Sequence, residues 1–143
     1  MAPGYDGLAM VTDPSEAEIR ERLAPLSRRA DVRLLVLFGS RARGLARPSS
    51  DIDVGVLVDG AFEAVGKEIV RLLSTDRVDV ANLRRVTPLL AMAIAKEGKP
   101  VYERDPGEFA SFASLALRRY NDTAKFRRLR ENGLKAFVKE RGL

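Results

Sequence analysis

The sequence contains no histidine and no cysteine. The absence of cysteine excludes disulfides and thiolate chemistry. The absence of histidine excludes histidine general bases, histidine metal ligands and every Ser–His or Cys–His nucleophilic pair. Catalysis by this chain therefore has to rest on Asp, Glu, Lys, Arg, Tyr or Ser, or on a hard metal ion held by oxygen ligands.

Long apolar runs are also lacking. None approaches the ~18 residues that a membrane span needs, and the N-terminus has neither the basic nor the apolar region of a secretory signal. We therefore expect a cytoplasmic protein without a membrane partner. A length of 143 residues, with 45% hydrophobic and 31% charged residues, fits one globular domain. The net charge of +5 favours anionic partners, although simple solubility explains it equally well.

Hydrophobic periodicity predicts helices alternating with strands, which indicates an α/β protein. Its expected fold is a small mixed β-sheet with flanking helices, the site on one face and a C-terminal helical segment. Strands are expected at 32–38, 51–58 and 78–83, with a short edge strand at 100–102. Helices are expected at 14–30, 62–73 and 89–96, and again after residue 105.

The first helix carries start and stop signals. Ser15 and Glu18 have the spacing of a capping box, and Pro14 suits a first helical position. Pro25 falls inside the apolar pattern, so the helix is expected to kink or stop there. Before this helix, residues 1–12 are predicted to be a flexible tail, and the core of the domain is predicted to span 13–103.

Residues 104–143 are predicted to form a helical basic segment of the same domain. Phe109 to Tyr120 make an apolar stripe, which favours packing over the sheet and leaves partner docking as the alternative. The helix is expected to reach Leu129 or Arg130 and to be interrupted at Asn132-Gly133. Residues 118–143 hold nine Lys or Arg against three Asp or Glu, a net charge of +6.

Two aspartates open the second predicted strand. Asp51 and Asp53 share one face of that strand, with Cα atoms ~6.6 Å apart at a rise of ~3.3 Å per residue. Their carboxylates suit Mg²⁺ or Mn²⁺, and a cation would keep both ionised in spite of their repulsion. A solvated pair at the start of an edge strand is the alternative. Asp79, alone between two apolar residues of a later strand, either faces water or completes a three-carboxylate metal site.

A Gly39-Ser40 turn ends the first strand. Glycine allows a backbone to approach a phosphate closely, and a helical turn after it directs free N–H groups at an anion. By itself the pair is weak, because an ordinary strand-ending turn explains it too. The sequence contains neither a Walker A loop nor a G-x-G-x-x-G fingerprint.

Taken together, these motifs resemble the nucleotidyltransferase superfamily of DNA polymerase beta. The string Phe38-Gly-Ser-Arg-Ala-Arg-Gly44 followed by Ser50-Asp-Ile-Asp-Val54 is similar to its minimal nucleotidyltransferases. The resemblance covers roughly residues 15–103. Small members of this kind are commonly paired with HEPN-domain toxins, for which they act as antitoxins.

The resemblance implies roles for particular residues. Asp51 and Asp53 would bind two Mg²⁺ ions, one of them carried in with ATP. Asp79 would ligate the second ion and help to deprotonate the acceptor hydroxyl. The nucleotide would be held by the residues of the turn and of the loop after it, namely Gly39, Ser40, Arg41, Arg43 and Ser50. Which of the two arginines points inward is not readable from the sequence.

The resemblance also implies a function, with alternatives. The first hypothesis is a Mg²⁺-dependent protein adenylyltransferase, an antitoxin that transfers AMP from ATP to a tyrosine hydroxyl of a cognate HEPN ribonuclease toxin. The second is an antitoxin that neutralises by binding alone. The third is a nucleotidyltransferase acting on a small molecule or a nucleic acid. For nucleic acid, the spacing of Tyr120, Phe126 and Phe137 fits helix packing better than base stacking.

Overall fold

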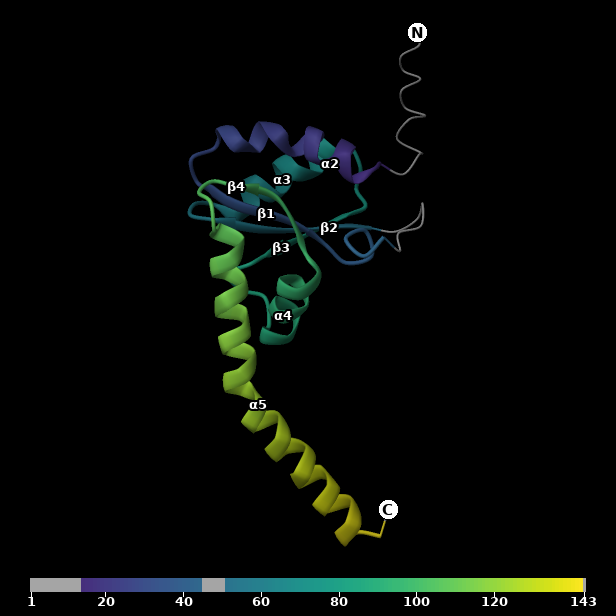
Figure 1. The fold of residues 1–143 in the computed structure, drawn as a ribbon. Coiled ribbons are helices and arrows are strands. Elements are labelled where there is room, and N and C mark those ends of the chain that lie inside the picture. The colour runs from purple at the N-terminus through teal and green to yellow at the C-terminus, as the bar shows by residue number, and fades with distance from the viewer. Residues whose placement is uncertain (1–13, 45–50, 143) are drawn as a thin grey trace.

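The computed structural model describes residues 14–44 and 51–142. Its centre is a four-stranded mixed sheet in the order β3-β2-β1-β4 (Figure 1). The strand β1 (Val32–Phe38) pairs antiparallel with β2 (Ile52–Val58) and with β4 (Lys99–Glu103), whereas β2 pairs parallel with β3 (Val78–Asn82). The predicted α/β class and the predicted edge strand are confirmed. The second strand begins one residue later than expected, and the third ends one residue earlier.

One face of the sheet is covered by α2 (Glu16–Leu23), the 3-10 helix η2 (Ala24–Arg28) and α3 (Phe62–Leu73). Strand β2 alternates in the predicted way: Ile52, Val54, Val56 and Val58 lie in the core beneath these helices. Figure 1 shows α2 and α3 together above the sheet. This layer holds the larger of the two apolar clusters, so it fixes the position of β1 and β2 from behind.

The start of α2 follows the predicted chemistry with one correction. Ser15 accepts a hydrogen bond from the Glu18 backbone N–H, and Glu18 returns one to the Ser15 N–H, so the capping box is confirmed. Ser15 is the N-cap, so Pro14 lies before the helix. The prediction that Pro14 is the first helical residue is therefore wrong. The α-helix ends at Leu23, and Pro25 lies in the 3-10 helix that follows, because proline has no N–H for an α-helical bond.

The other face is partly covered by α4 (Pro88–Glu97) and the first turns of α5 (Glu108–Glu140). Helices therefore lie on both faces of the sheet, and the predicted packing of the start of the C-terminal segment over the sheet is confirmed for Phe109 and Phe112. Gly98 follows α4 with an extended backbone, not a left-handed one. A Cβ there would meet Val36 Cγ1 at 2.6 Å, so glycine is needed for close packing of this corner against β1.

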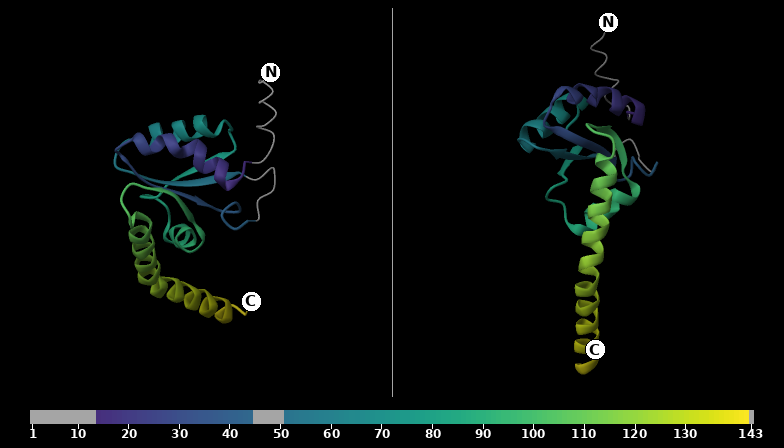
Figure 2. Two further views of the ribbon diagram at one scale, coloured as in Figure 1. Left: turned by 45° about the horizontal axis from the view of Figure 1, so that its top comes forward. Right: turned by 60° about the vertical axis from the view of Figure 1, so that its left-hand side comes forward.

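The C-terminal segment is a single helix. α5 runs through Asn132 and Gly133 without a break, so the predicted interruption is wrong. One glycine costs a helix only about 1 kcal/mol relative to alanine, which the neighbouring helix formers offset. Figure 2 shows α5 leaving the sheet and changing direction about midway. None of the helices among the described residues is long and apolar enough to cross a membrane.

Candidate active site

Three aspartates lie together at the end of the sheet where β2 and β3 begin. Asp53 of β2 pairs directly with Asp79 of β3 in the parallel register. Residues paired in this way point to the same side of the sheet, here the side opposite α2 and α3. Asp51 precedes β2 by one residue. Asp51 and Asp79 are exposed, whereas Asp53 is half-buried, so the group opens to solvent and its centre is shielded.

The electrostatics of Asp53 show that the three carboxylates act on one another. Burial raises the pKa of Asp53, and the charges of Asp79 and Asp51 raise it further. The charge of Arg41 acts in the opposite direction and lowers it. A cation placed among these oxygens would relieve the repulsion that raises the pKa of Asp53.

Gly39 brings the turn after β1 against this acidic group. Its φ is +76°, in the region that favours glycine. A Cβ at this position would overlap Oδ2 of Asp53 and lie 3.0 Å from its Cγ. The close contact places the backbone of Gly39-Ser40 beside the aspartates, although the two motifs belong to different strands. Phe38, the last residue of β1, pairs with Asp53 across the sheet and sets this alignment.

The turn itself is closed by two backbone hydrogen bonds. The Arg43 N–H donates to the Gly39 carbonyl at 3.3 Å, and the Gly44 N–H donates to the Arg41 carbonyl at 3.2 Å. Ala42 is buried and anchors the turn. This is the short helical turn that the sequence predicted, and the early N–H groups of such a turn are suited to bind an anion.

The two arginines of the turn have different surroundings. Arg41 acts on Asp53 through its charge, and its Nη1 donates to the Pro14 carbonyl at 3.4 Å. Arg43 forms an exposed ion pair with Glu97 of α4, with 3.5 Å between Nε and Oε2. The approach of Glu97 had no signal in the sequence, because it depends on how α4 packs. Of the two arginines, Arg41 is therefore the one whose charge acts on the acidic cluster. Ser50 lies outside the described residues.

The donor set fits a hard divalent cation in its chemistry. All three groups are carboxylates, the ligands that Mg²⁺ and Mn²⁺ prefer, and they are contributed by adjacent segments. Within residues 14–44 and 51–142, no three acidic side chains already stand at metal-ligand spacing. Binding would therefore require the exposed carboxylates of Asp51 and Asp79 to turn towards Asp53, which solvent exposure permits.

The chain is similar to known proteins over most of its length. The family described as "Polymerase beta, Nucleotidyltransferase" matches residues 21–107. The protein adenylyltransferase MntA of Aphanizomenon flos-aquae is 30% identical over 146 residues, covering 91% of this chain and 97% of the relative. The range matched by the family model spans the turn at Gly39 and the three aspartates.

Solved structures share the fold. A toxin–antitoxin structure with AMP-PNP contains a chain that is 22% identical, with a TM-score of 0.66, covering 80% of this chain and 98% of that chain. The structure of a tri-AMPylated Shewanella oneidensis HEPN toxin in complex with MNT antitoxin contains a chain that is 20% identical, with a TM-score of 0.61. That match covers 81% of this chain and 96% of the other.

Proposed function

The chain belongs to the polymerase beta nucleotidyltransferase family, and on that premise we propose that it is a protein adenylyltransferase and an antitoxin. It transfers AMP from ATP to a tyrosine hydroxyl of a cognate HEPN-type ribonuclease toxin. The observation that carries the proposal is the contact of Gly39 with Asp53. This contact places the turn that we propose to bind phosphate beside the cluster of three carboxylates. An ATP-dependent reaction of this kind belongs in the cytoplasm.

The reaction is a displacement at the α-phosphorus of ATP. The acceptor oxygen forms a bond to this phosphorus, the bond between it and the bridging oxygen to the β-phosphorus breaks, and pyrophosphate leaves. The hydroxyl proton is accepted by Asp79, whose exposed carboxylate borders the open side of the cluster. Asp79 would accept this proton while the acceptor tyrosine of the toxin is bound at the site.

The cluster is the proposed metal site, with Asp51, Asp53 and Asp79 as ligands. Bound Mg²⁺ ions, two of them by the resemblance, would neutralise triphosphate charge and polarise the α-phosphate. Asp53 supports this assignment because its half-buried carboxylate is destabilised by its acidic neighbours. Asp53 would hold its position through the β-ladder on both sides, since it pairs with β1 and β3.

The nucleotide is proposed to lie over the turn. The backbone at Gly39 and the hydroxyl of Ser40 would hold its terminal phosphates, and the absence of a Cβ at Gly39 leaves room for that approach. Arg41 would add positive charge, since it already acts on the adjacent Asp53. A similar role for Arg43 would require its ion pair with Glu97 to open. Ser50 stays a prediction from the motif.

The acceptor is proposed from the relatives. MntA of Aphanizomenon flos-aquae is a protein adenylyltransferase, and a HEPN toxin bound to an MNT antitoxin is tri-AMPylated. The open side of the cluster, bordered by the exposed Asp51 and Asp79, is accessible to a side chain presented by a folded partner. A tyrosine in an exposed segment of the toxin is the acceptor that we expect.

Labelled ATP tests the proposed transfer. The cognate toxin is incubated with this protein, Mg²⁺ and ATP carrying a label on either the α- or the γ-phosphate. We expect the α label to appear on a toxin tyrosine and the γ label in pyrophosphate. Transfer of the γ label to the toxin would make the protein a kinase and would contradict the proposal, as would the absence of label on a toxin that forms the complex.

Neutralisation by binding alone is the second candidate. It is favoured by one observation, the row of exposed apolar side chains on α5 beyond the body of the protein. The double variant Asp51→Asn with Asp53→Asn separates the two functions. If it neutralises the toxin at wild-type expression levels, binding is sufficient. If the toxin stays active although the complex forms, AMP transfer is required.

A further inference from the structure

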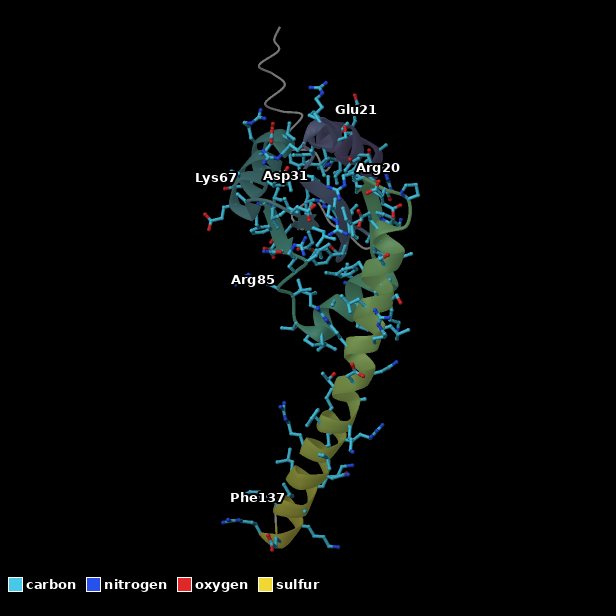
Figure 3. The ribbon with its side chains drawn as sticks, turned by 90° about the vertical axis from the view of Figure 1, so that its left-hand side faces the viewer. Arg20, Glu21, Asp31, Lys67, Arg85 and Phe137 are labelled. Atoms are coloured by element: carbon cyan, nitrogen blue, oxygen red, sulfur yellow. The ribbon has the colours of Figure 1, made fainter. Side chains whose placement is uncertain are left out.

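The outer half of α5 carries large apolar side chains that are exposed in the described chain, although the guanidinium of Arg141 lies over the Phe137 ring, 4.5 Å from its centroid. Phe126 is 70% exposed, Leu129 58% and Phe137 45%. Figure 3 shows side chains of this half, including the labelled Phe137, extending from a helix that has left the body. Isolated exposed apolar residues are common, but several on one projecting helix indicate an interaction surface.

These side chains share one face of the helix. At 100° per residue, Leu115, Phe126, Leu129 and Phe137 fall within an arc of about 80°. We call this set the outer stripe. The side chains of Lys125, Arg128, Lys135 and Lys139 fall on another arc, turned from it by roughly 130°. Other basic side chains, Arg118, Arg119 and Arg130, fall at the edges of the outer stripe, so positive charge flanks the apolar side chains as well as lying away from them.

The outer stripe is continuous with a cavity on the body of the protein. The cavity has a volume of about 280 Å³ and lies between β2, α4 and the start of α5, lined in part by Leu57 and Leu83. Leu115 and Arg119 border it and lie on the same helix face as the outer stripe. A partner helix lying along α5 would thus meet the apolar side chains of the outer stripe, with Arg119 and Asp122 between Leu115 and Phe126, and at its end a cavity that accepts a side chain.

The charges along the outer stripe and the cavity are mainly positive. Arg33, Arg84 and Arg119 line the cavity together with one acid, Glu108. The segment 118–143 has nine basic and three acidic residues. We propose that the outer stripe and the cavity dock an amphipathic helix of the toxin, apolar on one side and acidic at its margins. This inference rests on the proposed function and assigns the binding surface for its partner.

Two other occupants fit less well. Asp122 and Glu140 lie on the same side of α5 as the outer stripe, and an anionic lipid surface would repel them there. A second copy of this chain would bring the same net charge of +6 to the contact. Neither occupant accounts for a cavity large enough for a side chain at the end of the stripe. An acidic protein helix can keep its acidic side chains clear of Asp122 and Glu140, because Arg118, Lys125 and Arg130 lie beside the edges of the outer stripe, and it can present a side chain to the cavity.

The test compares two variants that leave the active site intact. Phe126→Ala combined with Leu129→Ala removes the middle of the outer stripe, while alanine keeps the helix. The matched control is Leu117→Ala, because Leu117 is 46% exposed on the opposite side of the same helix. Toxin affinity is measured by titration calorimetry with purified toxin, and helix content by circular dichroism. We expect the double variant to bind the toxin at least ~10-fold more weakly and the control to bind within about 2-fold of wild type.

Each outcome separates this surface from the proposed function. If wild type binds and AMPylates the toxin and the double variant binds equally well, the docking surface is wrong while the function stands. If wild type neither binds nor AMPylates the toxin, both are wrong. The assignment would also be wrong if the double variant kept its toxin affinity but lost self-association. The same holds if it kept its toxin affinity but lost binding to anionic vesicles. Weaker toxin binding with unchanged helix content supports it.

Discussion

The backbone of Gly39 lies against the carboxylate of Asp53, so closely that a Cβ at position 39 would overlap Oδ2. The Gly-Ser turn belongs to the end of β1, and the aspartate belongs to β2. Antiparallel pairing of Phe38 with Asp53 brings the two together. The proposed phosphate-binding turn and the proposed metal ligands therefore belong to one site, and a change to either should affect both.

Gly39→Ala tests this contact. The new methyl group would displace the Asp53 side chain, and the left-handed φ would cost about 1–2 kcal/mol. We expect AMP transfer to fall at least ~100-fold. The matched control is Gly44→Ala, because Gly44 has a similar φ of +73° but nothing within 4 Å of an added Cβ. It should lose similar stability and keep most of its activity. Equal loss of activity in both variants would show that backbone strain alone matters.

Asp53→Asn should stabilise the metal-free protein near neutral pH. Burial, and then the charges of Asp79 and Asp51, raise the pKa of Asp53 in the folded state. The stabilisation from its protonation is complete below the unfolded pKa and is lost as the pH rises through the folded pKa. Asparagine is not ionised, so the variant should melt at a higher temperature than wild type at neutral pH. The difference should vanish below the unfolded pKa.

Mg²⁺ should reverse this order. A ligand that binds only the folded state at 100 times its Kd adds about 2.7 kcal/mol. We expect wild type to gain stability on Mg²⁺ addition and Asp53→Asn to gain little. Thermal melts with EDTA and with excess Mg²⁺ measure both effects. An equal gain in the two proteins would place the binding of Mg²⁺ elsewhere.

The two arginines of the turn should differ in effect. Arg41→Ala removes the charge that acts on Asp53, so we expect KM for ATP to rise about 10-fold or more. Arg43→Ala removes an exposed ion pair with Glu97, worth at most about 1 kcal/mol, and should change KM little. Steady-state kinetics at varied ATP decide between them. A larger effect at Arg43 would mean that it leaves Glu97 when ATP binds.

Glu108 should hold α5 to the sheet. Its carboxylate is buried and accepts two hydrogen bonds from Arg33 of β1, at 2.9 Å from Nη2 and 3.3 Å from Nε. Glu108→Gln removes the negative charge and one of the two acceptor oxygens, which leaves the exposed Asp59 as the charged partner of this guanidinium among the described residues, so we expect a loss of about 1–3 kcal/mol in urea unfolding. Hydrogen exchange should increase in the first turns of α5. Unchanged exchange there would show that apolar packing alone holds the helix.

Local patterns were enough to predict much of this arrangement. The run Val32–Phe38 has the predicted strand bounds because apolar residues continue until Gly39 ends them. The alternation after Asp51 predicted which side of β2 carries Asp53. Prediction failed where distant contacts decide. The ion pair between Arg43 and Glu97 and the packing of Gly98 on Val36 depend on contacts that no short window contains. The continuity of α5 through Gly133 has a local cause instead, because the neighbouring helix formers offset the cost of one glycine.

The C-terminal stripe shows the same limit. Packing over the sheet was favoured for Phe109 to Tyr120, and Phe109 and Phe112 do pack against the second apolar cluster. Leu117 in the same predicted stripe is exposed. Helical periodicity identified an apolar face, but where α5 leaves the body depends on its packing against α4, which periodicity does not contain.

The intact mass of the cognate toxin is the most direct test of the central claim, that the aspartate cluster transfers AMP. Toxin is incubated with ATP and Mg²⁺ and either wild type or Asp53→Asn, under conditions in which both form the complex. Wild type should add one or more AMP masses to the toxin, and Asp53→Asn should add none. An unmodified toxin with wild type, or equal modification with the variant, would contradict the claim.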